Sequence, residues 1–198
     1  MLDYVINSEP KKHASILHPS IRDLLKKNNL QPRDLNAVAI SAGPGSYTGL
    51  RVGMAAAKGL CYSLNIPMIC ISTLEIMAWN AISEEYKEEA IYCPMIDARR
   101  MEVYTALYDK KLNVLMPPCS MILDENSFVD ELKKGNIIYF GNGSLKFSSL
   151  QKHPSAIFKS IIIIPQSMVA MSSEKFNKKE FSDVADNQPL YIKDFFTI

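Results

Sequence analysis

The sequence predicts an α/β protein built from two subdomains, and three observations carry that prediction. Apolar runs typical of buried strands alternate with helical patterns through the N-terminal part of the chain. A hairpin and mixed elements follow, so the rhythm changes. A charged segment, residues 84–89, separates the two parts. We therefore expect an N-terminal subdomain, residues 1–84, and a C-terminal subdomain, residues 85–198.

The composition is that of an ordinary globular protein, with 47% apolar and 22% charged residues. The net charge of +1 gives no general attraction to nucleic acids or membranes. The four cysteines form no C-x-x-C pair and are interpreted as free thiols in a reducing compartment. The first residues carry no basic, signal-like region, and no segment is long enough to span a bilayer. We expect a cytoplasmic protein.

The N-terminal subdomain is predicted to alternate strands and helices, with Pro19 expected to kink the first helix or to split it in two. The expected strands are residues 2–7, 37–40 and 66–71, and the expected helices are residues 11–29, 54–64 and 73–79.

The C-terminal subdomain is predicted to begin with a hairpin, followed by further strands and short helices. The expected elements are strands 91–97 and 102–108, helix 127–134, strand 137–140, the turn at residues 141–144, strand 161–164 and helix 167–176.

A glycine-rich turn, residues 41–53, joins a predicted strand to a predicted helix. Gly43, Gly45 and Gly49 can adopt positive φ, and Ser46 and Thr48 can cap the helix that follows. Amides at a helix start attract anions, so a degenerate nucleotide loop is conceivable. The stretch lacks the lysine of a Walker A loop and the third glycine of G-x-G-x-x-G. On these grounds, a tight turn is favoured over a ligand loop.

A stripe of small residues continues through the helix that follows. It consists of Gly49, Gly53, Ala56 and Ala57, with Leu60 and Leu64 further along the same side. Small residues allow another helix to approach closely. The pattern alone favours packing within the same domain, and the sharper interpretation is a surface that receives a partner's helix.

Candidate catalytic residues are few. Asp97 and Glu102 flank the hairpin turn and are a conceivable acid–base pair. Arg99 and Arg100 lie between them and favour the ionised form of both carboxylates. The pattern therefore favours a charged hairpin tip without a catalytic role. Arg51 can reach an anion or a partner. The three histidines, His13, His18 and His153, lack the spacing of a metal site, so we expect no metal.

Four motifs together resemble one family. The chain is similar to the TsaB (YeaZ) proteins of bacterial tRNA threonylcarbamoyladenosine biosynthesis, from Leu2 to about Lys193. The motifs are G-P-G-S-Y-T-G-L-R-V-G at residues 43–53, S-T-L at 72–74, I-D-A-R with E-V-Y at 96–104 and P-L-Y-I at 189–192.

The resemblance implies an actin-like fold of two ribonuclease-H-like halves. It implies a non-catalytic scaffold that pairs with TsaD, the larger paralogue, in a complex that modifies the adenosine beside the tRNA anticodon. TsaE, an ATPase, joins them, so ATP is used by the complex and no cofactor is assigned to this chain. In the family the contact is a helical bundle, matched here by residues 11–29 and 50–64.

The resemblance implies a partner surface of a few residues. This surface would face TsaD, or a second copy of the chain in a homodimer. It consists of Ile16, Arg51, Gly53, Ala56, Ala57, Leu60 and Leu64. The family also has a strand, a turn and a second strand before the segment matched by residues 2–7. We expect either an upstream start or a clipped form, with the first strands of the N-terminal subdomain lacking.

Two other functions are alternatives to this role. An actin-like enzyme that binds and hydrolyses a nucleotide would use the loop from Gly43 to Gly49, but the missing first turn counts against it. A peptidase, the family's old label, has no nucleophile or metal constellation in this sequence.

Overall fold

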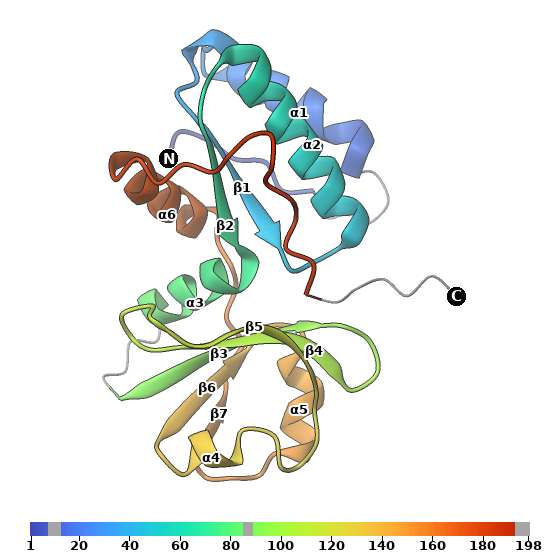
Figure 1. The fold of residues 1–198 in the computed structure, drawn as a ribbon, viewed down its shortest axis with the longest axis vertical. Helices are drawn as coiled ribbons and strands as arrows, with labels where there is room; N and C mark the ends of the chain where they lie inside the picture. Colours follow the sequence, from blue (N-terminus) through green and yellow to red (C-terminus); the bar gives the residue numbers. More distant parts are fainter. Residues whose placement is uncertain (8–12, 85–88, 193–198) are drawn as a thin grey trace. The chain divides into compact units, whose positions relative to one another are not determined.

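The computed structural model describes residues 1–7, 13–84 and 89–192, which form two compact units (Figure 1). Unit 1 consists of Met1–Ser72 and Pro165–Leu190, and unit 2 of Thr73–Ile164 with Tyr191 and Ile192 of the tail. This division differs from the one predicted at residue 84, because the helix after Ser72 packs in unit 2 and the helix from Pro165 packs in unit 1. Residues 85–88 of the predicted boundary lie outside the described residues. No described helix combines the length and apolar character needed to cross a bilayer.

Unit 1 is organised around a βαβ crossover. β1 (Val38–Gly43) and β2 (Met68–Ser72) pair in parallel, and α2 (Tyr47–Leu64) connects them. Parallel neighbours require such a crossover, because a short turn reverses the chain. Met54, Ala57 and Cys61 of α2 form a buried cluster with Met68 of β2. Asn65 ends the helix with φ of 53°, a conformation that asparagine tolerates.

α2 begins well inside the stretch that was predicted to be a turn. Its first residue is Tyr47, and the N-cap is Ser46, whose Oγ accepts a hydrogen bond from the Gly49 N–H at 3.4 Å. Of the two predicted caps, Ser46 has that role, and Thr48 is a helical residue. Gly49 and Gly53 are therefore helix positions. Tertiary packing compensates for the weak helix propensity of glycine, as it often does.

The N-terminal segment and α1 (His13–Lys27) differ from expectation. α1 continues through Pro19 as one helix, so the alternative of two abutting helices is wrong, and the predicted kink stays a prediction. Residues 2–7 have no regular secondary structure, so the predicted strand is wrong. An ion pair of 2.7 Å between Asp3 and Lys27 joins this segment to α1. The short 3₁₀ helix Pro32–Asp34 and α6 (Pro165–Asn177) complete unit 1 (Figure 1).

Unit 2 contains a five-stranded mixed sheet in the order β5-β4-β3-β6-β7. The central strand, β3, pairs antiparallel with β4 and parallel with β6, so the predicted hairpin is confirmed. The strands are β3 (Ala90–Asp97), β4 (Glu102–Tyr108), β5 (Val114–Ile122), β6 (Asn136–Phe140) and β7 (Ala156–Phe158), and the helices are α3 (Thr73–Glu84), α4 (Val129–Leu132) and α5 (Ser144–Leu150).

The two faces of this sheet bury separate clusters, because successive side chains of a strand point to opposite faces. Tyr92 packs with Leu74 and Met77 of α3 on one face. Cys93 packs with Leu132 of α4 and Phe147 of α5 on the other face. The sheet is therefore the middle layer of three.

Several elements of unit 2 were missed by sequence reasoning. β5 contains Pro117 and Pro118, which are tolerated because the strand lies at the sheet edge beside an irregular register. β7 and α5 are short. The predicted strand at Ile161–Ile164 is wrong. That segment has no regular secondary structure, and the Asn80 side chain donates to the Ile162 carbonyl at 3.0 Å.

Candidate partner-binding surface

The small-residue stripe of α2 packs inside unit 1. Gly49 and Gly53 line a cavity of about 350 Å³ together with Ile16 and Ile21 of α1. A Cβ atom placed on Gly53 would lie 3.2 Å from the Ile40 Cδ1 atom of β1, a tight contact. The small residue at Gly53 therefore lets β1 approach α2 closely, and α1 faces Gly49 and Gly53 across the cavity. The helix that the stripe faces belongs to the same chain.

The alanines and leucines of the predicted surface also contribute to internal packing. Ala57 is only 4% exposed and belongs to the cluster with Met54 and Cys61. Ala56 is buried, and Leu60 and Leu64 are half-buried. Among the predicted surface residues of α2, Arg51 is the exposed one.

A different side of α2 is open. Tyr47, Arg51, Ala55 and Tyr62 are all exposed, and Tyr62 reaches 86%. The Arg51 guanidinium carbon lies 4.1 Å from the centre of the Tyr47 ring, a cation–π contact. A Cβ atom on Gly59 would meet no other atom within 4 Å. We call this set, Tyr47, Arg51, Ala55, Gly59 and Tyr62, the open face of α2.

The open face was missed, although its signal was present in the sequence. These residues recur at spacings of three and four, which places them along one side of a helix. The prediction followed the small residues instead, of which Ala56 and Ala57 are buried and Gly49 and Gly53 are half-buried. Small residues mark a close approach in general and do not tell which helix makes it.

The glycine-rich turn packs against the chain's own tail. The Ala42 carbonyl accepts a hydrogen bond of 2.7 Å from the Leu190 N–H. Gly43 has φ of +111°, and a Cβ atom there would lie 3.1 Å from the Leu190 carbonyl oxygen. Gly45 is exposed. Gly43 thus serves a tight turn, and its contact with the tail was not predicted.

The hairpin between β3 and β4 ends in a network centred on Lys146 of α5. The Lys146 ammonium donates to the Asp97 carboxylate at 2.5 Å and to the carbonyls of Arg100 and Glu102 at 2.7 and 2.5 Å. Asn142 accepts from the Asp97 N–H at 2.9 Å. The hydrogen bond from Lys146 lowers the pKa of Asp97 below its ordinary value. Sequence reasoning missed Lys146, which lies far along the chain.

Asp97 and Glu102 are engaged separately. Asp97 pairs with Lys146, whereas the Glu102 carboxylate accepts from the Ser120 hydroxyl of β5. Both side chains therefore have partners that stabilise the tip. This arrangement is that of a charged hairpin rather than of a coupled acid–base pair.

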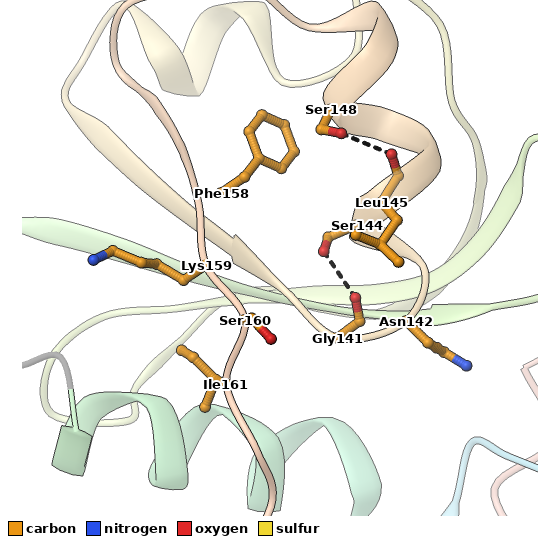
Figure 2. A pocket seen from close by; sticks show the side chains of 9 residues that line it. All are labelled: Gly141, Asn142, Ser144, Leu145, Ser148, Phe158, Lys159, Ser160 and Ile161. Atoms are coloured by element: carbon orange, nitrogen blue, oxygen red, sulfur yellow. Dashed lines mark hydrogen bonds between the residues drawn. The ribbon is translucent and has the colours of Figure 1, made fainter.

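A shallow pocket of about 330 Å³ lies beside this tip, at the ends of β6 and β7 (Figure 2). Gly141, Leu145 and Phe158 line it, with Lys159 and Ile161 at one side. Two of its hydroxyls bind backbone: Ser144 Oγ donates to Gly141 O at 2.8 Å, and Ser148 Oγ donates to Leu145 O at 2.7 Å (Figure 2). In the described part of the chain, no three His, Cys, Asp or Glu side chains gather as a metal site.

Comparison with known proteins places this fold in a family. The family model described as TsaD, tRNA N6-adenosine threonylcarbamoyltransferase, matches residues 6–185. The chain is 39% identical over 105 residues to the tRNA threonylcarbamoyladenosine biosynthesis protein TsaB of Bacillus subtilis (strain 168), covering 53% of this chain and 44% of that protein. It is 27% identical to TsaB of Escherichia coli (strain K12), covering 93% and 82%. The Bacillus alignment thus spans less than half of that relative.

Solved structures agree on the fold. A crystal structure from Pseudomonas aeruginosa, titled as an uncharacterized protein with similarity to peptidase YEAZ, superposes with a TM-score of 0.80 at 22% identity, covering 94% of this chain and 87% of that one. YeaZ from the same organism gives 0.76 at 23% identity, covering 92% and 85%. The actin-like α/β fold class is confirmed. The chain belongs to the TsaD family and is similar, within it, to the proteins named TsaB.

Proposed function

We propose that this chain is a non-catalytic subunit of the complex that forms N6-threonylcarbamoyladenosine in tRNA next to the anticodon. Family membership and the names of the relatives support this role. The direct partner is a TsaD-type paralogue. TsaE and tRNA join through the complex, which uses ATP, and this chain holds no cofactor of its own. We place the complex in the cytoplasm, in keeping with four free cysteines.

The observation that carries the proposal is the open face of α2. Tyrosine and arginine are enriched in protein interfaces, where they supply much of the binding free energy. Tyr62 is a large aromatic side chain that unit 1 leaves exposed. The Arg51 guanidinium is oriented by its contact with Tyr47, so less side-chain entropy is lost on binding.

The open face is also shaped for a helix. Ala55 and Gly59 lie four residues apart on it and present almost no side chain. Small residues at this spacing let a second helix pack closely, with the tyrosines and Arg51 around the contact. A second copy of the chain can use the same face, so a homodimer competes with the heterodimer in this proposal.

The experiment is co-purification of the full chain with TsaD from the same organism. Tyr62→Glu and Ala55→Arg are expected to abolish pairing, because each puts charge or bulk into the contact. Leu145→Glu is the matched control, since Leu145 is a similarly exposed apolar side chain in unit 2. Normal recovery of TsaD by both α2 variants would refute the assigned face.

Ala57→Arg tests the face against the buried side of the same helix. Ala57 lies in the core, so this change is expected to unfold unit 1, whereas Ala55→Arg leaves the circular dichroism spectrum and melting temperature nearly unchanged. Equal destabilisation by the two changes would show that Ala55 is also packed.

A further inference from the structure

The turn between β3 and β4 places two arginines in an unfavourable backbone conformation. Arg99 and Arg100 have φ of 69° and 48°, in the left-handed region. The turn is closed by a hydrogen bond of 3.0 Å from the Ala98 N–H to the Glu102 carbonyl and one of 3.1 Å from the Glu102 N–H to the Arg99 carbonyl. Glycine and asparagine adopt this conformation more easily than arginine does. The backbone alone therefore does not explain arginine at either position.

Side chains of α5 and of the turn before it hold the β3–β4 turn in place. Lys146 donates to the Arg100 carbonyl, to the Glu102 carbonyl and to the Asp97 carboxylate, and its own side chain is only 18% exposed. Asn142 binds the Asp97 N–H from the neighbouring turn. These contacts join the tip to α5 and to the end of β6. The two arginines thus project from a fixed base.

Both guanidinium groups are available. Arg99 and Arg100 are exposed, and neither side chain has an ion pair or hydrogen bond with another described residue. Lys146 pairs with Asp97, the acidic residue closest in sequence to Arg99. The end of the β3–β4 hairpin therefore presents two adjacent, exposed guanidinium groups. Arginine forks match the geometry of phosphate oxygens, to which they donate two parallel hydrogen bonds.

We propose that the Arg99–Arg100 tip binds the phosphodiester backbone of RNA. This inference rests on the proposed function, in which the complex that contains this chain must hold a tRNA. A rigid turn with two guanidinium groups suits neighbouring phosphates of one strand, and such contacts position an RNA without reading its sequence. Lys146 is a positioning residue in this arrangement.

The test measures binding of a fluorescently labelled, unmodified tRNA transcript by anisotropy, for the full chain alone and with its TsaD-type partner. The variant is Arg99→Asn with Arg100→Gly, which removes both charges and suits the backbone, so the hairpin is expected to stay folded. The matched control is Lys110→Gln with Lys111→Gln, which removes two charges from the next hairpin tip, between β4 and β5.

We expect the arginine variant to bind tRNA about tenfold more weakly at 0.1 M salt, and the slope of log affinity against log salt to fall by roughly 1.5. The lysine control is expected to stay within about twofold of the parent chain. Equal loss in both variants would overturn the inference, because it would show a non-specific charge effect. Unchanged affinity of the arginine variant, or no tRNA binding by the parent chain in either setting, would overturn it as well.

Two readouts separate this inference from the proposed function. Co-purification with TsaD reports on the proposed function and is expected to be unaffected by the arginine variant. Loss of TsaD pairing with unchanged tRNA affinity would make the tip a contact for an acidic protein surface and would overturn the RNA inference. A parent chain that binds tRNA through the arginines but never pairs with TsaD would refute the proposed function alone.

Discussion

The Lys146 ammonium lies 2.5 Å from the Asp97 carboxylate, although 49 residues separate the two in sequence. The same ammonium donates to two backbone carbonyls of the β3–β4 hairpin. One side chain of α5 therefore satisfies three acceptors at the tip. Because charge-assisted hydrogen bonds are stronger than neutral ones, Lys146 is expected to fix the hairpin against α5.

Lys146→Met is expected to lower the free energy of unfolding by about 2 kcal/mol. The change keeps the aliphatic stem but removes the ammonium donor from the Asp97 carboxylate and from the Arg100 and Glu102 carbonyls, of which the Glu102 carbonyl keeps the Ala98 N–H. Urea denaturation followed by circular dichroism measures the effect. Lys152→Met is the control, because Lys152 is exposed and, among the described residues, donates to the Ser148 carbonyl alone. A loss no larger than that of the control would mean that water replaces the ammonium without cost.

Acid is expected to weaken the same contact. Lys146 lowers the pKa of Asp97 from its ordinary value of 3.8, so the folded state favours the ionised carboxylate. The stabilisation is therefore present in full above the unfolded pKa and is lost as pH falls through the lower, folded pKa. Asp97 is 45% exposed, so solvent limits the effect to about 1 kcal/mol or less.

The measurement is the difference in unfolding free energy between the parent chain and Asp97→Asn from pH 7 to pH 2. We expect a constant difference above about pH 5 that shrinks as the pH falls below the ordinary carboxylate range. A difference that grows in acid would show that the pKa of Asp97 is raised in the fold.

Local patterns predicted the elements whose signals are strong and short in range. β2, the β3–β4 hairpin, β6 and α6 follow from apolar runs and turn residues, and they appear near the expected positions. The strand predicted at Ile161–Ile164 fails because an apolar run alone does not specify a pairing partner. β5 was missed because its two prolines are acceptable only at a sheet edge, which is a property of the assembled sheet.

The candidate surface shows the same limit. The helix that carries it was predicted, but Ala56 and Ala57 of the predicted surface are buried, and the rest of that surface stays a prediction. Ala57 looked available for a partner because the sequence does not show that it packs with Met54 and Cys61 in the core of unit 1. Gly53 is half-buried beside Ile40 of β1. Tyr62 shares the helical spacing of Tyr47 and Arg51, but the sequence does not show that unit 1 leaves it exposed. Lys146 carried no local signal at all, because its three acceptors lie far away in the chain.

Two glycines are expected to respond oppositely to alanine. Gly141 has φ of +92°, and a Cβ atom there would lie 2.4 Å from the Met95 carbonyl oxygen, so Gly141→Ala is expected to cost about 2 kcal/mol or more. Gly59 lies inside α2 with open space around it, so Gly59→Ala is expected to stabilise by roughly 0.5–1 kcal/mol. Thermal unfolding of both variants checks the pair. A stable Gly141→Ala protein would show that the β6–α5 turn relaxes away from β3.

Two buried hydroxyls in the unit 2 sheet are expected to behave differently on removal. The Tyr139 hydroxyl is fully buried, and no described residue gives it a hydrogen-bond partner. Burial raises the pKa of Tyr139, so the group stays neutral. Tyr139→Phe removes an unsatisfied polar atom but keeps the ring packed against Phe147 and Phe158. We expect the free energy of unfolding to stay equal or to rise by about 1 kcal/mol.

Thr105→Val is the matched comparison, because the Thr105 hydroxyl donates to the Pro94 carbonyl at 2.8 Å and is equally buried. Its loss leaves that carbonyl without this donor, so the free energy of unfolding is expected to fall by roughly 1–2 kcal/mol. Urea titrations of both variants give the comparison directly. A clear loss of stability in Tyr139→Phe would show that an ordered water satisfies the hydroxyl. The buried tyrosine would then be part of a polar network within the sheet rather than a cost that ring packing offsets.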